Sequence, residues 1–204
     1  SAQKLSEMPR LLRLLATNSA KLLDYRKLAG ELQISDKTVS AYVELLRTVF
    51  LVHLVPAWRP GLRSRERQTP KLYLTDTGLL AQQLGVNEQR IADDDQVTGY
   101  ALETFCGMEI LKHQSWATEH STLRHYRVHD DEIDILLEAP SGDLAAIEVK
   151  ARASIRENDW RVMRKLREDR PERFKAGIVL YSGRQTIPLS DRIWAVPISG
   201  LWSQ

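Results

Sequence analysis

The chain has 204 residues, of which 27% are charged and 43% are apolar, and its 29 Lys and Arg residues nearly balance 27 Asp and Glu. This composition is typical of a globular protein and excludes a disordered, collagen-like or disulfide-rich chain. No apolar run approaches the ~18 residues that span a bilayer, and residues 1–20 lack the uninterrupted apolar core of a signal peptide. Because the lone Cys106 cannot form an internal disulfide, we expect a reducing, cytoplasmic location without a membrane partner.

Charge is distributed unevenly along the chain. Residues 1–90 contain 14 Lys and Arg and 8 Asp and Glu, a net charge of +6, whereas residues 91–204 contain 15 and 19, a net charge of −4. A basic half is compatible with nucleic-acid binding but does not require it. Residues 85–96 interrupt the apolar pattern and are expected to form a linker, which divides the chain into domains 1–88 and 89–204.

The first domain has the pattern of a winged helix-turn-helix. Helices are expected from about Ser6, over residues 25–32 and after Ser35, with the two serines acting as N-caps. The third helix has an apolar face with i, i+3, i+4, i+7 spacing, formed by Val39, Tyr42, Val43 and Leu46. Extended segments at 50–58 and 71–75 follow, so two tightly joined helices precede a β-hairpin, as in winged helices.

In a winged helix, the outward face of the third helix and the tip of the hairpin contact DNA. The residues expected to bind nucleic acid are therefore Lys37, Ser40 and Arg47 on the helix, and Arg63, Arg65 and Arg67 at the tip. The alternative is a plain packing module, because Glu44 in the middle of the outward face would repel phosphate. The tryptophans are expected to anchor the core or its edge, with Trp58 beside the tip as a candidate for stacking on a base.

The second domain carries the candidate chemistry. A helix is expected over residues 99–112, with Glu103 beside its apolar stripe, and strands over residues 123–129, 132–138 and 144–150. The last two strands are joined by the turn residues Pro140, Ser141 and Gly142. If that hairpin is centred on Ser141, Asp134 lies opposite Glu148, with Cβ atoms about 4.5–5.5 Å apart.

Two carboxylates at this range repel each other unless a cation or a shared proton lies between them. A hard divalent ion resolves the repulsion, and Mg²⁺ suits a site with few carboxylates and several waters, with Mn²⁺ as the substitute to test. Lys150 lies two residues after Glu148 and points to the same side of the strand. The alternative is that the same register places Glu132 opposite Lys150, where the two form a plain cross-strand ion pair.

The order Glu103, Asp134, Glu148-Val149-Lys150 resembles the PD-(D/E)xK nuclease superfamily, over about residues 97–198. The resemblance implies an α+β or α/β fold, with a restriction-endonuclease-like mixed sheet flanked by helices. It departs from the family at Ile133, where the namesake proline would stand. The implied catalytic residues are Glu103, Asp134, Glu148 and Lys150, with Asp134 and Glu148 as metal ligands, and the residues expected to hold the phosphodiester backbone are Arg152, Arg156 and Arg161.

A second resemblance covers nearly the whole chain. Residues 70–80, Leu102-Glu103 and residues 146–150 are similar to the C-terminal region of a prokaryotic AAA-type ATPase family, whose members place an ATP-binding core before a winged helix and a nuclease-like domain. The chain contains no G-x-x-x-x-G-K-[ST] loop and does not begin with Met. We therefore expect a C-terminal fragment whose partner is the ATPase domain of the same full-length chain.

Together these patterns favour a metal-dependent DNA nuclease domain with an attached DNA-binding winged helix. The alternative is a non-catalytic DNA- or partner-binding regulatory module that retains a nuclease-like fold.

Overall fold

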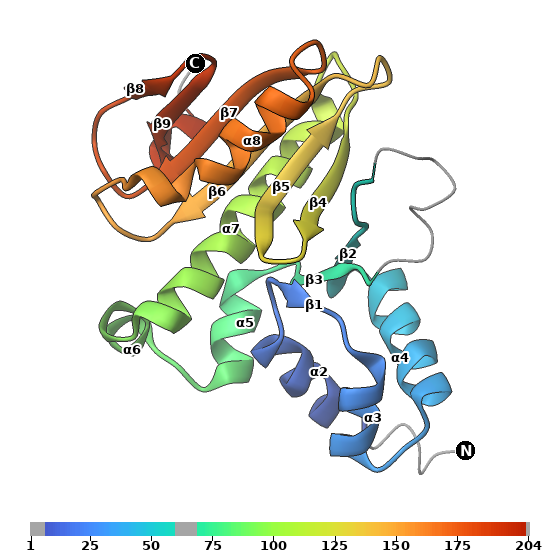
Figure 1. Cartoon of the computed structure of the whole chain (residues 1–204). Coiled ribbons are helices and arrows are strands. Elements are labelled where there is room, and N and C mark those ends of the chain that lie inside the picture. Colours follow the sequence, from blue (N-terminus) through green and yellow to red (C-terminus); the bar gives the residue numbers. More distant parts are fainter. Residues whose placement is uncertain (1–6, 60–68, 203–204) are drawn as a thin grey trace. The chain divides into compact units, whose positions relative to one another are not determined.

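The computed structural model describes residues 7–59 and 69–202, which form two compact units (Figure 1). The first unit consists of Ser1–Val55 and Thr69–Phe105, and the second of Pro56–Gln68 and Cys106–Gln204. Helices accompany a three-stranded sheet in the first unit and a six-stranded mixed sheet in the second, so the expected α+β class is confirmed. The expected domain boundary after residue 88 stays a prediction. Among the described residues, no helix has both the length and the apolar character needed to cross a bilayer.

The first unit contains the expected pair of adjacent helices. Its elements are α2 (Met8–Thr17), β1 (Lys21–Leu22), α3 (Tyr25–Leu32), α4 (Asp36–Thr48), β2 (Val52–Val55), β3 (Lys71–Leu74), α5 (Thr77–Leu84), α6 (Glu88–Asp93) and the first half of α7 (Asp95–Trp116). The predicted N-cap of α4 is confirmed, because Ser35 Oγ accepts a hydrogen bond of 3.1 Å from the Thr38 N–H. The predicted cap Ser6 lies outside the described residues.

The apolar face of α4 forms the core of the first unit. The four residues predicted from helical spacing are all buried: Val39, Tyr42, Val43 and Leu46. They pack with Leu11 and Leu15 of α2 in a single apolar cluster. The expected hairpin is present, since β2 pairs antiparallel with β3, and β1 adds a short strand on the other side of β3.

The expectation of a linker over residues 85–96 is wrong. Asn87 Oδ1 accepts a hydrogen bond of 2.9 Å from the Arg90 N–H and begins α6. Asp94 Oδ1 accepts hydrogen bonds from the N–H groups of Gln96 and Val97 at the start of α7. The polar residues that interrupt the apolar pattern therefore act as helix caps, which is the role that short oxygen-bearing side chains favour.

The C-terminal end of α4 is a strained turn. Phe50 has a φ of 59°, a left-handed conformation that costs a residue with a Cβ atom about 1–2 kcal/mol. Hydrogen bonds hold this conformation, from the Phe50 N–H to the Arg47 carbonyl at 3.1 Å and from Thr75 Oγ1 to the Phe50 carbonyl at 2.5 Å. The turn leads directly into β2.

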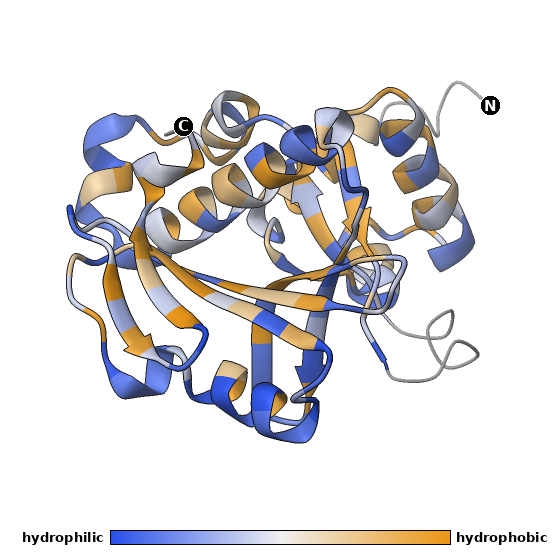
Figure 2. Ribbon diagram, turned by 90° about the horizontal axis from the view of Figure 1, so that it is seen from above, coloured by the Kyte–Doolittle hydropathy of each residue, from blue (hydrophilic) through white to orange (hydrophobic). Residues whose placement is uncertain are grey.

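The second unit is built on one sheet, with the strand order β4-β5-β6-β7-β9-β8. Its strands are β4 (Thr122–Val128), β5 (Asp131–Glu138), β6 (Leu144–Lys150), β7 (Phe174–Tyr181), β8 (Ile187–Ser190) and β9 (Ile193–Pro197), and its short helices are η2 (Glu157–Asp159), α8 (Arg161–Asp169) and η3 (Ile198–Leu201). The pairs β4–β5, β5–β6 and β8–β9 are antiparallel, whereas β6–β7 and β7–β9 are parallel. Figure 2 shows that apolar residues follow these strands, while the surrounding loops and helix ends are hydrophilic.

Helix α8 packs closely against the sheet at Gly177 of β7. A Cβ atom on Gly177 would lie 3.1 Å from Met163 Sδ, Ile193 Cγ1 and Phe174 Cζ. Met163 belongs to α8 and is fully buried. The absence of a side chain at Gly177 therefore sets how near α8, and with it Arg161, can approach the sheet.

We expect Gly177→Ala to destabilise the protein by about 1–3 kcal/mol, because the added methyl group overpacks the contact with Met163. The matched control is Gly30→Ala in α3, where a Cβ atom would meet nothing within 4 Å. That substitution should stabilise the protein by about 0.5–1 kcal/mol, because alanine loses less backbone entropy than glycine in a helix. Urea denaturation measures both changes, and equal effects of the two variants would contradict the close approach of α8.

Candidate functional site

The β5–β6 hairpin has the register expected from a turn centred on Ser141. Ile135 pairs with Ile147, and Leu136 pairs with Ala146. The same register, continued by one residue, puts Asp134 opposite Glu148. Asp134 Oδ2 accepts a hydrogen bond of 3.0 Å from the Val149 N–H, which ties this carboxylate to the neighbouring strand.

Both carboxylates are buried, and their surroundings shift the pKa of Glu148. Asp134 is 9% exposed and Glu148 is 7% exposed. Burial, followed by the nearby charge of Asp134, raises the pKa of Glu148 well above its ordinary value. Lys150 Nζ donates a hydrogen bond of 2.8 Å to Glu148 Oε2. Although burial alone lowers the pKa of Lys150, the charges of Glu148 and Asp134 outweigh it and raise this pKa, so Lys150 stays positive.

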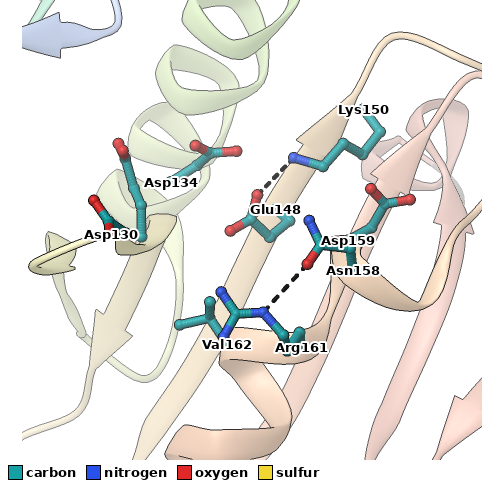
Figure 3. A pocket seen from close by; sticks show the side chains of 9 residues that line it. Asp130, Asp134, Glu148, Lys150, Asn158, Asp159, Arg161 and Val162 are labelled. Atoms are coloured by element: carbon teal, nitrogen blue, oxygen red, sulfur yellow. Dashed lines mark hydrogen bonds and ion pairs between the residues drawn. The ribbon is translucent and has the colours of Figure 1, made fainter.

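Asp134, Glu148 and Lys150 line a polar pocket of about 260 Å³. Figure 3 shows the two carboxylates on neighbouring strands, with Lys150 directed back toward Glu148. The other lining residues are Asp130, Glu132, Asn158, Asp159, Arg161 and Val162. Five of the nine lining residues are therefore acidic and two are basic, so the pocket suits a cation better than an anion.

The donor set fits a hard divalent ion with few protein ligands. Asp134 and Glu148 would hold it, because Mg²⁺ is usually bound through one or two carboxylates and keeps several waters. In the parts of the chain that the structure describes, no group of three or more His, Cys, Asp and Glu side chains is arranged to hold a metal ion.

The alternative considered for Lys150, a cross-strand ion pair with Glu132, differs from the ion pairs that these two residues form. Lys150 forms its ion pair with Glu148 on the same strand. Glu132 forms an ion pair with Arg127 across the β4–β5 ladder, at 3.4 Å. Lys150 is therefore directed toward the pocket with the two buried carboxylates.

Two of the three arginines expected to bind phosphate, Arg152 and Arg161, form ion pairs with neighbouring carboxylates. Arg152 forms an ion pair with Asp159. Arg161 lies 2.9 Å from Asp131 and donates to Asn158 Oδ1 at 3.2 Å (Figure 3). The backbone N–H of Arg156 donates a hydrogen bond to Asp159 Oδ2, and Arg156 is exposed. Contact with phosphate stays a prediction for all three.

Asp131 joins the β4–β5 hairpin to α8 at the edge of the pocket. Its Oδ2 accepts a hydrogen bond of 2.6 Å from Lys165 Nζ, and its Oδ1 lies 2.9 Å from Arg161. The hydrogen bond from Lys165 is the largest of the effects that lower the pKa of Asp131 below its ordinary value. This cluster holds the Arg161 guanidinium at the pocket.

The residues predicted to bind DNA in the first unit have different exposures. Lys37 and Arg47 are exposed, Ser40 is half-buried, and Arg47 forms an ion pair with Glu44 at 3.3 Å. Arg63, Arg65 and Arg67 lie outside the described residues. Their role in DNA binding stays a prediction.

Trp58 does not offer its ring for stacking on a base. The residue is 2% exposed, and its Nε1 donates a hydrogen bond of 3.1 Å to Glu138 within the second unit. The stacking role considered for Trp58 is therefore wrong, because the ring fills the apolar core of that unit.

Glu103 lies in the first unit, where it neutralises a buried cation. Its Oε1 accepts hydrogen bonds from Lys71 Nζ at 2.7 Å and from the Tyr73 hydroxyl at 2.9 Å. Lys71 is 1% exposed and Tyr73 is fully buried. Sequence reasoning missed these two partners, although a lysine within the apolar segment Lys71–Leu74 is a signal of a buried ion pair. The catalytic role of Glu103 stays a prediction.

The comparisons with known proteins follow the two halves of the chain. The model described as "Domain of unknown function (DUF4143)" matches residues 98–201, and the chain belongs to this family. Another, "Domain of unknown function (DUF8612)", matches residues 1–90.

The chain is also similar to uncharacterized proteins of Mycobacterium bovis and Mycobacterium tuberculosis, each 27% identical over 192 residues. The similarity covers 93% of this chain but 41% of each relative, so the chain spans about two fifths of the length of these curated relatives. No solved structure matches the chain.

We expect Glu103→Ala to destabilise the protein by about 3 kcal/mol, because removing one partner of a buried ion pair leaves the other charge poorly compensated. The matched control is Glu109→Ala on the same helix, since Glu109 pairs with the exposed Lys112. Its loss should cost less than about 1 kcal/mol. Chemical denaturation of the two variants measures both losses of stability. Similar denaturation midpoints would contradict a large contribution of the Glu103–Lys71 ion pair.

Asp134→Asn should instead stabilise the metal-free protein by about 1 kcal/mol, because it removes a negative charge beside Glu148 and keeps an oxygen for the Val149 N–H. The gain should shrink as the pH falls from about 8 toward about 4.5. Over this range the raised pKa of Glu148 lets the folded protein bind a proton before the unfolded chain does, and protonation removes the same repulsion. Thermal unfolding in a chelator across this pH range measures the difference, and a loss of stability at the alkaline end would contradict the repulsion.

Proposed function

We propose that the chain is a metal-dependent DNA nuclease domain that hydrolyses phosphodiester bonds with Mg²⁺ or Mn²⁺. The observation that supports this is the meeting of Asp134 and Glu148, two buried carboxylates, in a pocket they share with Lys150. Like charges held together in a buried site cost free energy, and such perturbed groups are common where chemistry takes place. A divalent ion between the two carboxylates would offset this cost.

The residues of the pocket have distinct roles in this proposal. Asp134 and Glu148 would hold the ion, together with the Val149 carbonyl. When bound, the ion supplies Lewis-acid polarisation of a phosphoryl oxygen. Lys150 orients the attacking water and stabilises the negative charge that develops on the phosphate, because its raised pKa favours the charged ammonium over a neutral base.

The arrangement of the second unit supports a restriction-endonuclease-like fold. Asp134 is on β5, and Glu148 and Lys150 are on β6 in the interior of the sheet, with α7 before these strands and α8 after them. This is the order expected from the resemblance to PD-(D/E)xK nucleases. The contacts of Glu103 with Lys71 and Tyr73 favour an anchoring role for Glu103 over direct metal ligation.

DNA is the proposed partner of both units. The order helix, strand, helix, helix, strand, strand in α2 to β3 supports a winged helix in the first unit. Lys37 and the net charge of +6 over residues 1–90 supply attraction to phosphate, and Arg156 adds an exposed positive residue two positions before Asn158 of the pocket. Affinity that rests on these charges falls as salt concentration rises.

An ATPase domain of the same full-length chain is the second proposed partner. The resemblance to the AAA-type ATPase family supports it, as does the greater length of the mycobacterial relatives. The presence of a single, buried cysteine, Cys106, supports a cytoplasmic location for the assembly.

A non-catalytic DNA- or partner-binding regulatory module is the second candidate function. The observation that favours it is the group of exposed apolar side chains at the end of α4, because exposed apolar patches mark interaction surfaces. In this case the ion would bind at Asp134 and Glu148 without turnover.

We expect Mn²⁺ to raise the melting temperature of the wild-type protein and to support cleavage of branched or linear DNA. Asp134→Asn, Glu148→Gln and Lys150→Met should each lower cleavage by about 100-fold or more, because each removes a group that acts on the phosphate or holds the ion. The first two should also abolish the thermal shift, whereas Lys150→Met should keep it.

Asp143→Asn is the matched control, because Asp143 lies at the opposite end of the same hairpin and pairs with Lys175. It should retain both the cleavage and the thermal shift. A thermal shift without cleavage would favour the regulatory module, and cleavage that persists in Asp134→Asn would contradict the assignment of the site.

A further inference from the structure

Three of the described basic side chains of the second unit have no hydrogen bond or ion pair. They belong to Arg156, Arg170 and Arg184, all of which are exposed. Other basic residues of this unit, such as Arg152 with its partner Asp159, have contacts that a ligand would have to replace. The three unpaired guanidinium groups can therefore bind an anion without first leaving a carboxylate.

The loop after β7 lies at the end of the sheet where the pocket is found. Lys150 of the pocket is the last residue of β6, and it pairs with Tyr181, the last residue of the parallel strand β7 (Figure 1). Ser182 Oγ donates a hydrogen bond of 2.9 Å to the Ala151 carbonyl, which joins the chain just after β7 to the chain just after β6. Residues 182–186, the β7–β8 loop, are therefore neighbours of the segment that follows Lys150.

Arg184 is at the centre of the β7–β8 loop, and Tyr181 holds the loop on both sides of it. Tyr181 is 2% exposed and belongs to the apolar core of the second unit. Its hydroxyl donates a hydrogen bond of 2.6 Å to the Gln185 carbonyl. Its ring packs so closely on Gly183 that a Cβ atom at this position would overlap the ring. The backbone is therefore fixed just before and just after Arg184, while the residue itself is exposed.

Arg170 provides a contrast, because it lies at the other end of β7. Its carbonyl accepts a hydrogen bond of 2.9 Å from the N–H of Phe174, the first residue of that strand. The eight-residue strand separates it from the β7–β8 loop by about 23 Å. Arg170 and Arg184 thus share charge and exposure, but they differ in their distance from the pocket end of the sheet.

The segments that follow β6 and β7 carry positive charge. Residues 151–156 and 182–186 contain three arginines and no Asp or Glu, whereas five of the nine residues that line the pocket are acidic. Positive groups attract the phosphates of DNA, and the planar guanidinium of arginine can bind a phosphate through two parallel hydrogen bonds. This edge of the sheet therefore offers phosphate contacts beside a centre that suits a cation.

We propose that Arg184 contacts a phosphate of a DNA strand bound at the pocket, and that Tyr181 is the positioning residue that holds Arg184 for this contact. The identity of the ligand rests on the proposed function, whereas the contact itself rests on the place of Arg184 in the β7–β8 loop. Because Tyr181 already fixes this loop, binding costs less entropy than it would for a loop that must be ordered.

Binding of a labelled DNA duplex by the intact chain, measured in a chelator over a range of salt concentrations, tests the contact. Arg184→Gln should weaken binding by about 3- to 10-fold and reduce the slope of log K against log salt by about 0.9, because one phosphate contact is lost. Arg184→Lys should keep the slope, because it keeps the charge. Arg170→Gln is the matched control and should bind DNA as the wild type does.

Kinetics and a double-mutant cycle test the two roles separately. In Mn²⁺, Arg184→Gln should raise KM by about 3- to 10-fold and keep kcat within about 2-fold, as expected for a contact outside the reacting centre. Tyr181→Phe removes the hydrogen bond to Gln185 and keeps the ring in the core. It should weaken DNA binding of the wild type but not that of Arg184→Gln, because both substitutions act on the same contact.

The contact would be overturned by an Arg184→Gln variant that matches Arg170→Gln in affinity and salt slope, or by a wild-type chain that binds no DNA. The positioning role would be overturned if Tyr181→Phe weakened binding equally with and without Arg184. Binding that depends on Arg184 but leads to no cleavage would support the contact and contradict the nuclease activity. Cleavage with the same KM in Arg184→Gln and the wild type would support the nuclease activity and contradict the contact.

Discussion

Electrostatic repulsion between two buried carboxylates is the constraint around which the second unit is organised. Asp134 and Glu148 occupy facing positions on β5 and β6, where the sheet leaves each less than one-tenth exposed. The Val149 backbone N–H donates a hydrogen bond to Asp134, and the Lys150 ammonium donates one to Glu148. Even with these two donors, burial and, after it, the charge of Asp134 raise the pKa of Glu148 well above its ordinary value. In the proposed function, a bound divalent ion would offset the remaining repulsion.

The arrangement around the pocket follows from the same charges. Asp131 forms an ion pair with Arg161, and Asp159 forms one with Arg152, so two arginines are paired with carboxylates in or beside the acidic pocket. Arginines arranged in this way are already ordered before a phosphate arrives, which lowers the entropy that binding would cost. An incoming phosphate must still compete with the carboxylates that hold them.

The features that could be predicted from sequence depend on residues close to one another along the chain. The register of β5 and β6 follows from the turn at Pro140–Gly142, because a short hairpin loop determines which residues face each other. The helices α3 and α4 follow from spacing and from the Ser35 cap. The prediction of a linker is wrong because Asn87 and Asp94 interrupt an apolar pattern and yet each begins a helix.

What escaped prediction depends on contacts between distant segments. Lys71 and Glu103 are 32 residues apart, and nothing near Glu103 indicates that its partner is a buried lysine of another element. The basic neighbours of Trp58 in sequence favour a solvent-exposed position, but its partner Glu138 is 80 residues away. The hydrogen bond between Asp131 and Lys165 is another contact between distant segments, since the two residues are 34 positions apart. Periodicity reports which face of an element is apolar, and it carries no information about which charged residue arrives from elsewhere.

The path of the chain between the two units has a consequence for how they are inherited and produced. The chain leaves the first unit after Val55, contributes Pro56–Gln68 to the second, and then returns at Thr69. Trp58 is anchored there through its N–H to the His125 carbonyl at 2.7 Å. No single break in the polypeptide yields two whole units, because any fragment that starts after residue 68 lacks the indole of its own core. A C-terminal half exchanged by recombination would depend on the recipient chain for the residue that fills the place of Trp58.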